Sequence, residues 1–93
     1  AAACISVFCE RDSKFLVEDG CAATQNMIIA AKAYGVDSCW VAGYERPYSE
    51  DIRELLGVPE KYKLISLISL GYSDKSASRP KKTLNEVVRW EKY

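Results

Sequence analysis

Apolar residues along this chain form three short continuous runs, separated by two stretches in which they recur at helical spacing. The runs CISVFC (4–9), SCWVAG (38–43) and KLISLISLGY (63–72) are rich in β-branched, aromatic or other apolar residues and are bounded by polar segments, so each predicts a strand. CISVFC is apolar on both faces, which is typical of an inner strand. KLISLISLGY is apolar at both parities, and we expect it in the middle of the sheet.

The stretches between the runs predict two helices. Residues 17–34 carry apolar residues at helical spacing, with acidic Glu18 and Asp19 at the start and Gly35 at the end. The many alanines predict close approach by neighbouring elements, so we expect a central helix that is buried on most of its surface. A shorter helix is predicted from Ser49, as its N-cap, to Gly57.

The end of the chain combines a polar, proline-broken loop, SDKSASRPKK, with the segment TLNEVVRWEKY (83–93). The apolar residues of that segment are too many to be left in water, so the tail is expected to dock on something: Leu84, Val87, Val88, Trp90 and Tyr93. The order strand-helix-strand-helix-strand plus a C-terminal extension indicates an α/β alternation. The sequence lacks the glycine-rich phosphate-binding turns of Rossmann and P-loop proteins.

Composition limits the possible function. A chain of 93 residues, 48% of them hydrophobic, can form one small core and therefore one domain at most. Thirteen basic and thirteen acidic side chains cancel, so no overall field favours nucleic acid or an anionic membrane as a partner. No apolar run is long enough to cross a bilayer and no signal-peptide layout is present, which predicts a soluble, cytoplasmic protein.

Catalytic and metal-binding side chains are scarce. The four cysteines form no CxxC pair and no histidine accompanies them, so reduced core thiols are expected rather than zinc or disulfides. Without histidine, Ser-His and Cys-His nucleophilic catalysis is excluded. Two acidic pairs, at 18–19 and 50–51, fall in first helical turns, where acids are favoured anyway. The sequence therefore predicts no catalytic residue and no metal ligand.

Two features point to a ligand. Gly43, at the exit of the second strand, would let a flat ligand meet backbone N–H groups directly, although a simple turn glycine is the more common explanation. The cluster SRPKK places Arg79, Lys81 and Lys82 together, which suits a phosphate monoester, although short charge runs are usually solvated loops.

Taken together and in order, these segments resemble a known family. EDGCAATQNMIIAAKAYGVDSCWVAGY, then IRELLGVPEKYKLISLISLGY, then RPKKTLNEVVRWEKY is similar to the C-terminal half of the FMN-dependent nitroreductase family. The resemblance implies an α+β, nitroreductase-like fold with a mixed, mainly antiparallel sheet flanked by helices. It also implies that residues 1–93 are the C-terminal portion of a single such domain, whose N-terminal half is absent.

The resemblance further implies a function. It predicts a homodimer with FMN at its interface and an exchanged C-terminal tail, in which hydride passes from NAD(P)H through the flavin to a nitroaromatic, quinone or related small-molecule acceptor. The backbone of Val41, Ala42 and Gly43 would face the flavin, with Trp40 as core or pocket wall. Lys82, with Arg79 or Lys81, would hold the phosphate.

The chain also departs from the family pattern. Many relatives carry an acidic residue before the pocket glycine, whereas this chain has Ala42, so no role of that carboxylate is carried over. Deiodinases and the enzyme that fragments FMN belong to the same family, and the sequence does not select among these activities. The alternative is a truncated, non-catalytic relative that acts as an oligomerisation or interaction module.

Overall fold

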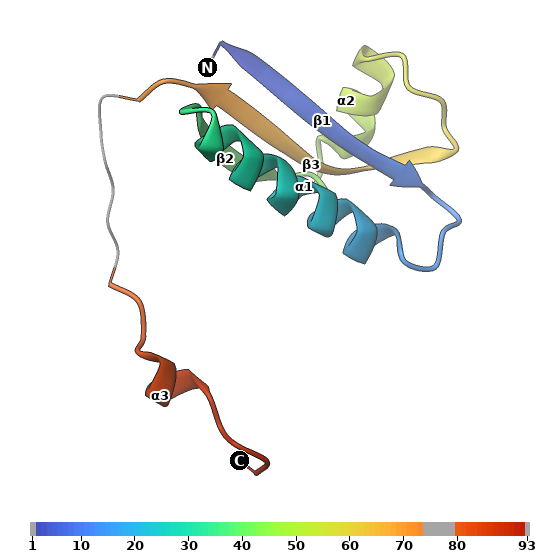
Figure 1. Ribbon diagram of the computed structural model, residues 1–93. Helices are drawn as coiled ribbons and strands as arrows, with labels where there is room; N and C mark the ends of the chain where they lie inside the picture. Colours follow the sequence, from blue (N-terminus) through green and yellow to red (C-terminus); the bar gives the residue numbers. More distant parts are fainter. Residues whose placement is uncertain (1, 74–79, 93) are drawn as a thin grey trace.

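The elements of the protein follow the predicted alternation. The computed structural model describes residues 2–73 and 80–92. In chain order the elements are β1 (Ala3–Glu10), α1 (Leu16–Ala33), β2 (Asp37–Ala42), α2 (Ser49–Leu55), β3 (Tyr62–Gly71) and α3 (Leu84–Val87) (Figure 1). Each predicted strand lies within one residue of the observed one at both ends.

The three strands form one sheet in the order β1-β3-β2, and β3 runs antiparallel to both neighbours. The central position of β3 confirms the prediction from its two apolar faces. The prediction for β1 was wrong within the described residues, because β1 pairs only with β3 and lies at an edge. Helix α1 lies across one face of the sheet and connects the two edge strands, which run parallel to each other (Figure 1).

A β-bulge changes which side chains of β3 share a face. Val7 pairs with Ser66 and Phe8 pairs with Leu64, so Ile65 is an extra residue on β3. Ile65 therefore joins Val7 in the buried cluster beneath α1, together with Ile68. Strict alternation along β3 would place Ile65 and Ile68 on opposite faces, and the bulge brings them to the same face.

The closest contact between α1 and the sheet involves small residues. Gly20 and Thr24 lie one helical turn apart and are the buried residues of α1. A Cβ atom on Gly20 would lie 2.5 Å from Ile65 Cγ2, so only glycine fits this position. The Thr24 hydroxyl donates to Gly20 O at 2.6 Å and lies 2.7 Å from Ser66 Oγ, which satisfies both buried hydroxyls.

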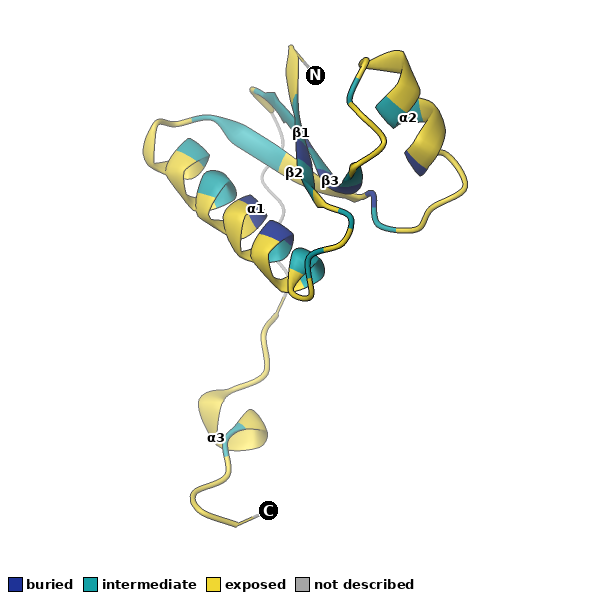
Figure 2. Ribbon diagram, turned by 90° about the vertical axis from the view of Figure 1, so that its right-hand side faces the viewer, coloured by how far each residue is buried: buried dark blue, intermediate teal, exposed yellow. Residues whose placement is uncertain are grey.

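Helix α1 is less buried than predicted. Most of its residues are exposed to solvent, including Ile29 at 58%, and only one stripe faces the sheet (Figure 2). The close approach to the sheet was predicted from the alanines, but Gly20 and Thr24 provide it. Among the described residues, no element covers the outer face of α1.

The predicted C-terminal ends of both helices are confirmed. Gly35 and Gly57 have positive φ angles of 77° and 70°. The amide of each glycine donates to a carbonyl three residues earlier in the helix, and the amide of the next residue donates to a carbonyl five residues before it. This is the glycine C-terminal motif in which the left-handed conformation ends a helix.

The four cysteines are free thiols, and the prediction that they lie in the core was wrong for two of them. Cys4 and Cys39 are exposed, whereas Cys9 and Cys21 pack against the buried cluster. Burial raises the pKa of the Cys9 thiol, and the nearby Asp19 carboxylate raises it further. In the part of the chain that the structure describes, no three metal-ligating side chains come together, and no helix is long and apolar enough to span a membrane.

The contact at Gly20 provides a test of the fold. Gly20→Ala should lower the free energy of unfolding by about 1–3 kcal/mol, because the added methyl group overlaps Ile65. Helix propensity alone predicts the opposite sign, a gain of about 1 kcal/mol. Urea unfolding followed by circular dichroism separates the two, and a stability equal to or above that of the parent chain would contradict the packing model.

Candidate functional site

Gly43 lies directly after β2 and is buried. Its N–H donates to Ile65 O at 3.2 Å, and its carbonyl accepts a hydrogen bond from the Ser49 hydroxyl. A Cβ atom at this position would lie 2.8 Å from Leu64 Cγ and 3.1 Å from Ser66 N. The absence of a side chain is thus explained by close packing on β3. A flat ligand was the alternative to a simple turn glycine in the prediction, but the Gly43 amide already has a partner within the sheet.

The residues before Gly43 lie on the open edge of β2. The hydrogen bond from Gly43 to Ile65 fixes the alternation of the ladder, so the backbone groups of Trp40 and Ala42 point away from β3. The Ala42 carbonyl accepts a hydrogen bond from the Tyr48 hydroxyl. The N–H groups of Trp40 and Ala42 therefore face outward at an edge where a planar acceptor could meet them.

The side chains on this edge are apolar and half-exposed. Trp40 is 40% exposed and lies opposite Ile68, whereas Val41 is 38% exposed and lies opposite Leu67, on the other face of the sheet. Trp40 is thus not a core residue, and its expected role as a pocket wall stays a prediction. Each face of the sheet therefore carries one uncharged, half-exposed side chain beside the outward amides.

The loop between β2 and α2 is held against the edge by several contacts. The Ser49 hydroxyl accepts from the Arg46 amide at 2.9 Å in addition to its bond to Gly43. The prediction that Ser49 caps α2 was wrong, because the helix begins at Ser49 itself and this hydroxyl is engaged with the loop. Lys63 donates to Glu45 at 3.0 Å, which lowers the pKa of that carboxyl, and its ammonium lies 4.9 Å from the centre of the Tyr44 ring.

The acidic residue Glu50 anchors the start of α2. Arg11 Nη2 lies 3.1 and 3.2 Å from its two carboxylate oxygens, and Arg53 Nε lies 3.1 Å from one of them. The hydrogen bond from Arg11 is the main reason that the pKa of Glu50 lies below its ordinary value. Arg11 also donates to the Glu60 and Tyr62 carbonyls, so the network joins β1, α2 and β3. Glu50 therefore has a structural role at the start of α2.

The predicted phosphate site is only partly described. Arg79 lies outside the described residues, while Lys81 and Lys82 are exposed. The following helix, α3, makes no contact with any other described element. The structure therefore does not bring the two lysines to the edge of β2, and the two parts of the predicted site stay separate within one chain.

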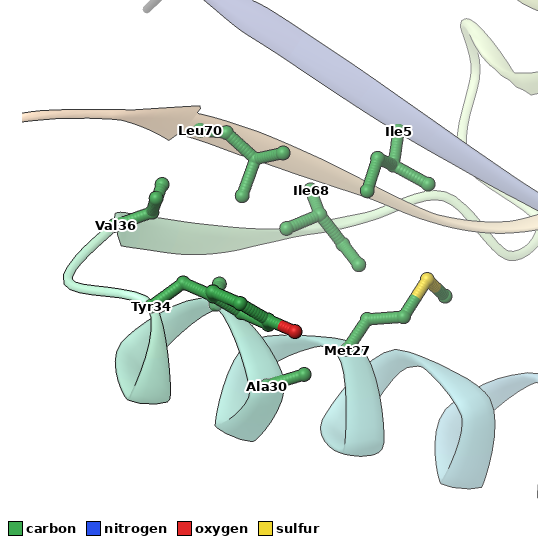
Figure 3. Close-up of a pocket in the computed structure, with 8 residues that line it drawn as sticks. Ile5, Met27, Ala30, Tyr34, Val36, Ile68 and Leu70 are labelled. Carbon is green, nitrogen blue, oxygen red and sulfur yellow. The ribbon is translucent and has the colours of Figure 1, made fainter.

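A cavity of about 370 Å³ lies elsewhere, between the second half of α1 and the sheet (Figure 3). Its walls are almost entirely apolar: Ile5, Met27, Ala30, Ala31, Tyr34, Val36, Ile68 and Leu70. The Tyr34 ring extends from the end of the helix toward Met27 (Figure 3). The walls carry no charged group that could hold a phosphate, so this cavity is not an extension of the candidate site.

Sequence reasoning missed the residues that hold the edge of β2 in place. Leu64 fills the space beside Gly43, and the hydroxyls of Tyr48 and Ser49 bond to the last two carbonyls of that edge. Predicting the contact between Leu64 and Gly43 would have required knowledge of the register between β2 and β3. The only signal in the sequence was the pair of hydroxyl residues, Tyr48 and Ser49, six positions after Ala42 and Gly43.

Comparisons with known proteins point to one family. Residues 7–72 match the model of the nitroreductase family. A proposed NADH dehydrogenase/NAD(P)H nitroreductase of Archaeoglobus fulgidus is 44% identical over 57 residues, which cover 60% of this chain and 33% of that protein.

Solved structures agree with this match. An FMN-dependent nitroreductase from Clostridium difficile R20291 superposes with a TM-score of 0.84 at 26% identity, over 97% of this chain and 57% of that one. A nitroreductase with bound FMN from Bacteroides fragilis gives a TM-score of 0.73 at 26% identity, over 96% and 50%. The chain thus spans about half the length of these structures and a third of the archaeal relative.

The packing of Gly43 gives a prediction. Gly43→Ala should lower the free energy of unfolding by about 1–3 kcal/mol because its methyl group would overlap Leu64. The double variant Gly43→Ala/Leu64→Ala should lose less than the sum of the two single losses, since the smaller residue makes room. Denaturant unfolding of all four proteins completes the cycle. Additive losses would show that Leu64 does not require the glycine.

Proposed function

The chain belongs to the nitroreductase family, and on this basis we propose that it supplies part of an FMN-dependent NAD(P)H oxidoreductase acting on nitroaromatic, quinone or related acceptors. The observation that carries the proposal is the family match over residues 7–72, most of the folded part of the chain. The Bacteroides fragilis structure with bound FMN, which aligns over 96% of the chain, supports it further. When bound, FMN would supply the hydride chemistry that amino-acid side chains lack.

The described residues fit one side of a flavin. The outward amides of Trp40 and Ala42 can donate to ring heteroatoms, and the uncharged side chain on either face of this edge, Trp40 or Val41, can lie against a planar ring. Ser49 and Tyr48 hold this edge in place through their bonds to Gly43 and Ala42. These residues would bind and orient the cofactor, and we assign none of them a proton-transfer step.

The lysines of the tail would serve the phosphate. Lys81 and Lys82 are exposed and available, and two adjacent cations suit a phosphate monoester. Because α3 of the tail contacts no strand of its own chain, a complete site on this proposal draws on more than one polypeptide segment or subunit. A homodimer with exchanged tails meets this requirement.

Flavin binding tests the proposal. The isolated protein should show absorbance between roughly 350 and 500 nm, or acquire it on incubation with FMN. Lys82→Ala should weaken FMN binding about tenfold, since a charge-assisted hydrogen bond is lost. Lys92→Ala, a cation in the same tail, is the matched control and should bind as the parent does. A protein that is colourless and cannot be reconstituted with FMN would refute the proposal.

The tail gives a separate prediction. Leu84 is 69%, Val87 58% and Trp90 83% exposed, so the tail leaves much apolar surface in water unless a partner covers it. Deletion of residues 83–93 should shift the protein from dimer toward monomer or aggregate in light scattering after gel filtration. A truncated protein that stays dimeric would show that the tail is not exchanged.

The same exposure supports a second candidate function, a non-catalytic interaction module that is stable only when further polypeptide covers it. Apolar side chains are exposed on α1 as well as on the tail, including Ile29 and Tyr34. Intact mass separates the candidates. A mass of 93 residues with no flavin favours the module, and a larger mass with flavin bands favours the enzyme.

A further inference from the structure

Arg46 is exposed, and among the basic side chains of residues 2–73 it is the one without an ion pair, a hydrogen bond or a ring contact within the described structure. The other basic side chains of this part of the chain each have such a contact: Arg11, Lys14, Lys32, Arg53, Lys61 and Lys63. Exposed cations are usually solvated, so the significance of Arg46 depends on where it lies.

The backbone of Arg46 is fixed beside the end of the candidate edge. Its N–H donates to Ser49 Oγ at 2.9 Å, and its carbonyl accepts from the Ser49 N–H at 3.0 Å. The same Ser49 hydroxyl donates to the carbonyl of Gly43, the residue that ends the ladder between β2 and β3. Pro47 follows and restricts the backbone of Arg46 to extended conformations. The side chain of Arg46 therefore starts from a defined point three residues after Gly43.

Acidic side chains near Arg46 in the sequence do not neutralise it. Glu45 accepts a hydrogen bond from Lys63 at 3.0 Å. Glu50 lies 3.1 Å from the guanidinium nitrogens of two other arginines. Asp51, in the first turn of α2, makes no ion pair with Arg46 in the described structure. The positive charge of Arg46 is thus uncompensated beside the candidate edge.

A guanidinium group in this place suits a phosphate. Its planar set of N–H donors matches two oxygens of a phosphate group, which a single ammonium cannot do. The candidate edge itself offers backbone N–H groups and the uncharged side chains of Trp40 and Val41, but no cation. A nicotinamide that lies against a ring at this edge carries its pyrophosphate one ribose away. The anion would then lie beyond the edge residues, where the loop of Arg46 begins.

We propose that Arg46 binds the pyrophosphate of the NAD(P)H donor through hydrogen bonds from its guanidinium group. The inference rests on the proposed function, because that function supplies the dinucleotide. The phosphate of FMN is assigned to Lys81 and Lys82, so the two phosphate-bearing ligands are held by different cations. Arg46 is a binding residue for the donor and takes no part in hydride transfer.

Equilibrium binding tests the proposal without turnover. NAD⁺ carries the same pyrophosphate but has no hydride to give, so it is titrated calorimetrically into the chain after incubation with FMN. Arg46→Ala should weaken NAD⁺ binding at least about tenfold, since charge-assisted hydrogen bonds are lost. Arg46→Lys keeps the charge without the planar donors and should lose less. Circular dichroism should show an unchanged fold, because the side chain has no contacts within the described structure.

Lys61→Ala is the matched control. Lys61 is also an exposed cation in a loop, but it follows α2 at the start of β3 and its ammonium lies 5.1 Å from the centre of the Tyr62 ring. This substitution should leave NAD⁺ binding within about twofold of the parent, because a surface charge away from the ligand acts only through screened interactions. A loss equal to that of Arg46→Ala would show a general effect of charge and would overturn the assignment to Arg46.

Two further ligands identify which phosphate Arg46 binds. NADP⁺ should lose affinity by the same factor as NAD⁺ in Arg46→Ala, because both contain the pyrophosphate. A loss confined to NADP⁺ would place Arg46 on the additional phosphate and overturn the proposal. FMN titrated into the chain without flavin should bind the parent and Arg46→Ala alike. A loss of FMN affinity equal to that of NAD⁺ would make the flavin phosphate the ligand and would also overturn it.

Failure of this inference can be told from failure of the proposed function. A chain that takes up FMN but does not bind NAD⁺, or binds it equally well with and without Arg46, overturns the inference alone. A chain that cannot be loaded with FMN refutes the proposed function, and the inference falls with it.

Discussion

The close approach of α1 to β3 is the contact on which the rest of the fold depends. Gly20 permits the helix backbone to lie against Ile65, and Thr24 places a hydroxyl beside Ser66 one turn later. This contact fixes the position of α1 over the sheet, so the loops that join the helix to β1 and β2 begin at defined points. The bulge at Ile65 is part of the same arrangement, because it brings the Ile65 side chain to the face that Gly20 meets.

Strand β3 also positions the candidate site. β3 positions β2 through the ladder that ends at Gly43 and Ile65, and it fills the space beside Gly43 with Leu64. The outward amides of β2 are thereby held at a rigid edge, while the lysines of the tail lie on a segment without contacts to that edge. The edge of β2 is thus positioned by β3, whereas the two lysines that we propose for the phosphate lie on a segment that β3 does not position.

Local signals predicted much of the fold. Glycines at 35 and 57 end helices because the left-handed conformation costs a glycine little, and this can be inferred without tertiary structure. The central position of β3 followed from its apolar residues on both faces. The bulge, the packing of Leu64 on Gly43 and the role of the Ser49 hydroxyl depend on register and on contacts distant in the sequence, so no local pattern could have revealed them. The error for β1 has a different origin: apolar residues on both faces of a strand do not require a neighbouring strand on both of its edges.

The buried hydroxyls of Thr24 and Ser66 form a chain with a direction. Thr24 uses its single hydrogen to bond Gly20 O, so Ser66 must donate to Thr24. Loss of the serine hydroxyl would remove a donor but leave the threonine hydrogen bonded, whereas loss of the threonine hydroxyl would leave a buried serine without its acceptor. The two positions therefore differ in the substitutions that they tolerate. Alanine at position 66 costs less stability than valine at position 24, so substitutions in this part of the core are expected in the strand before the helix.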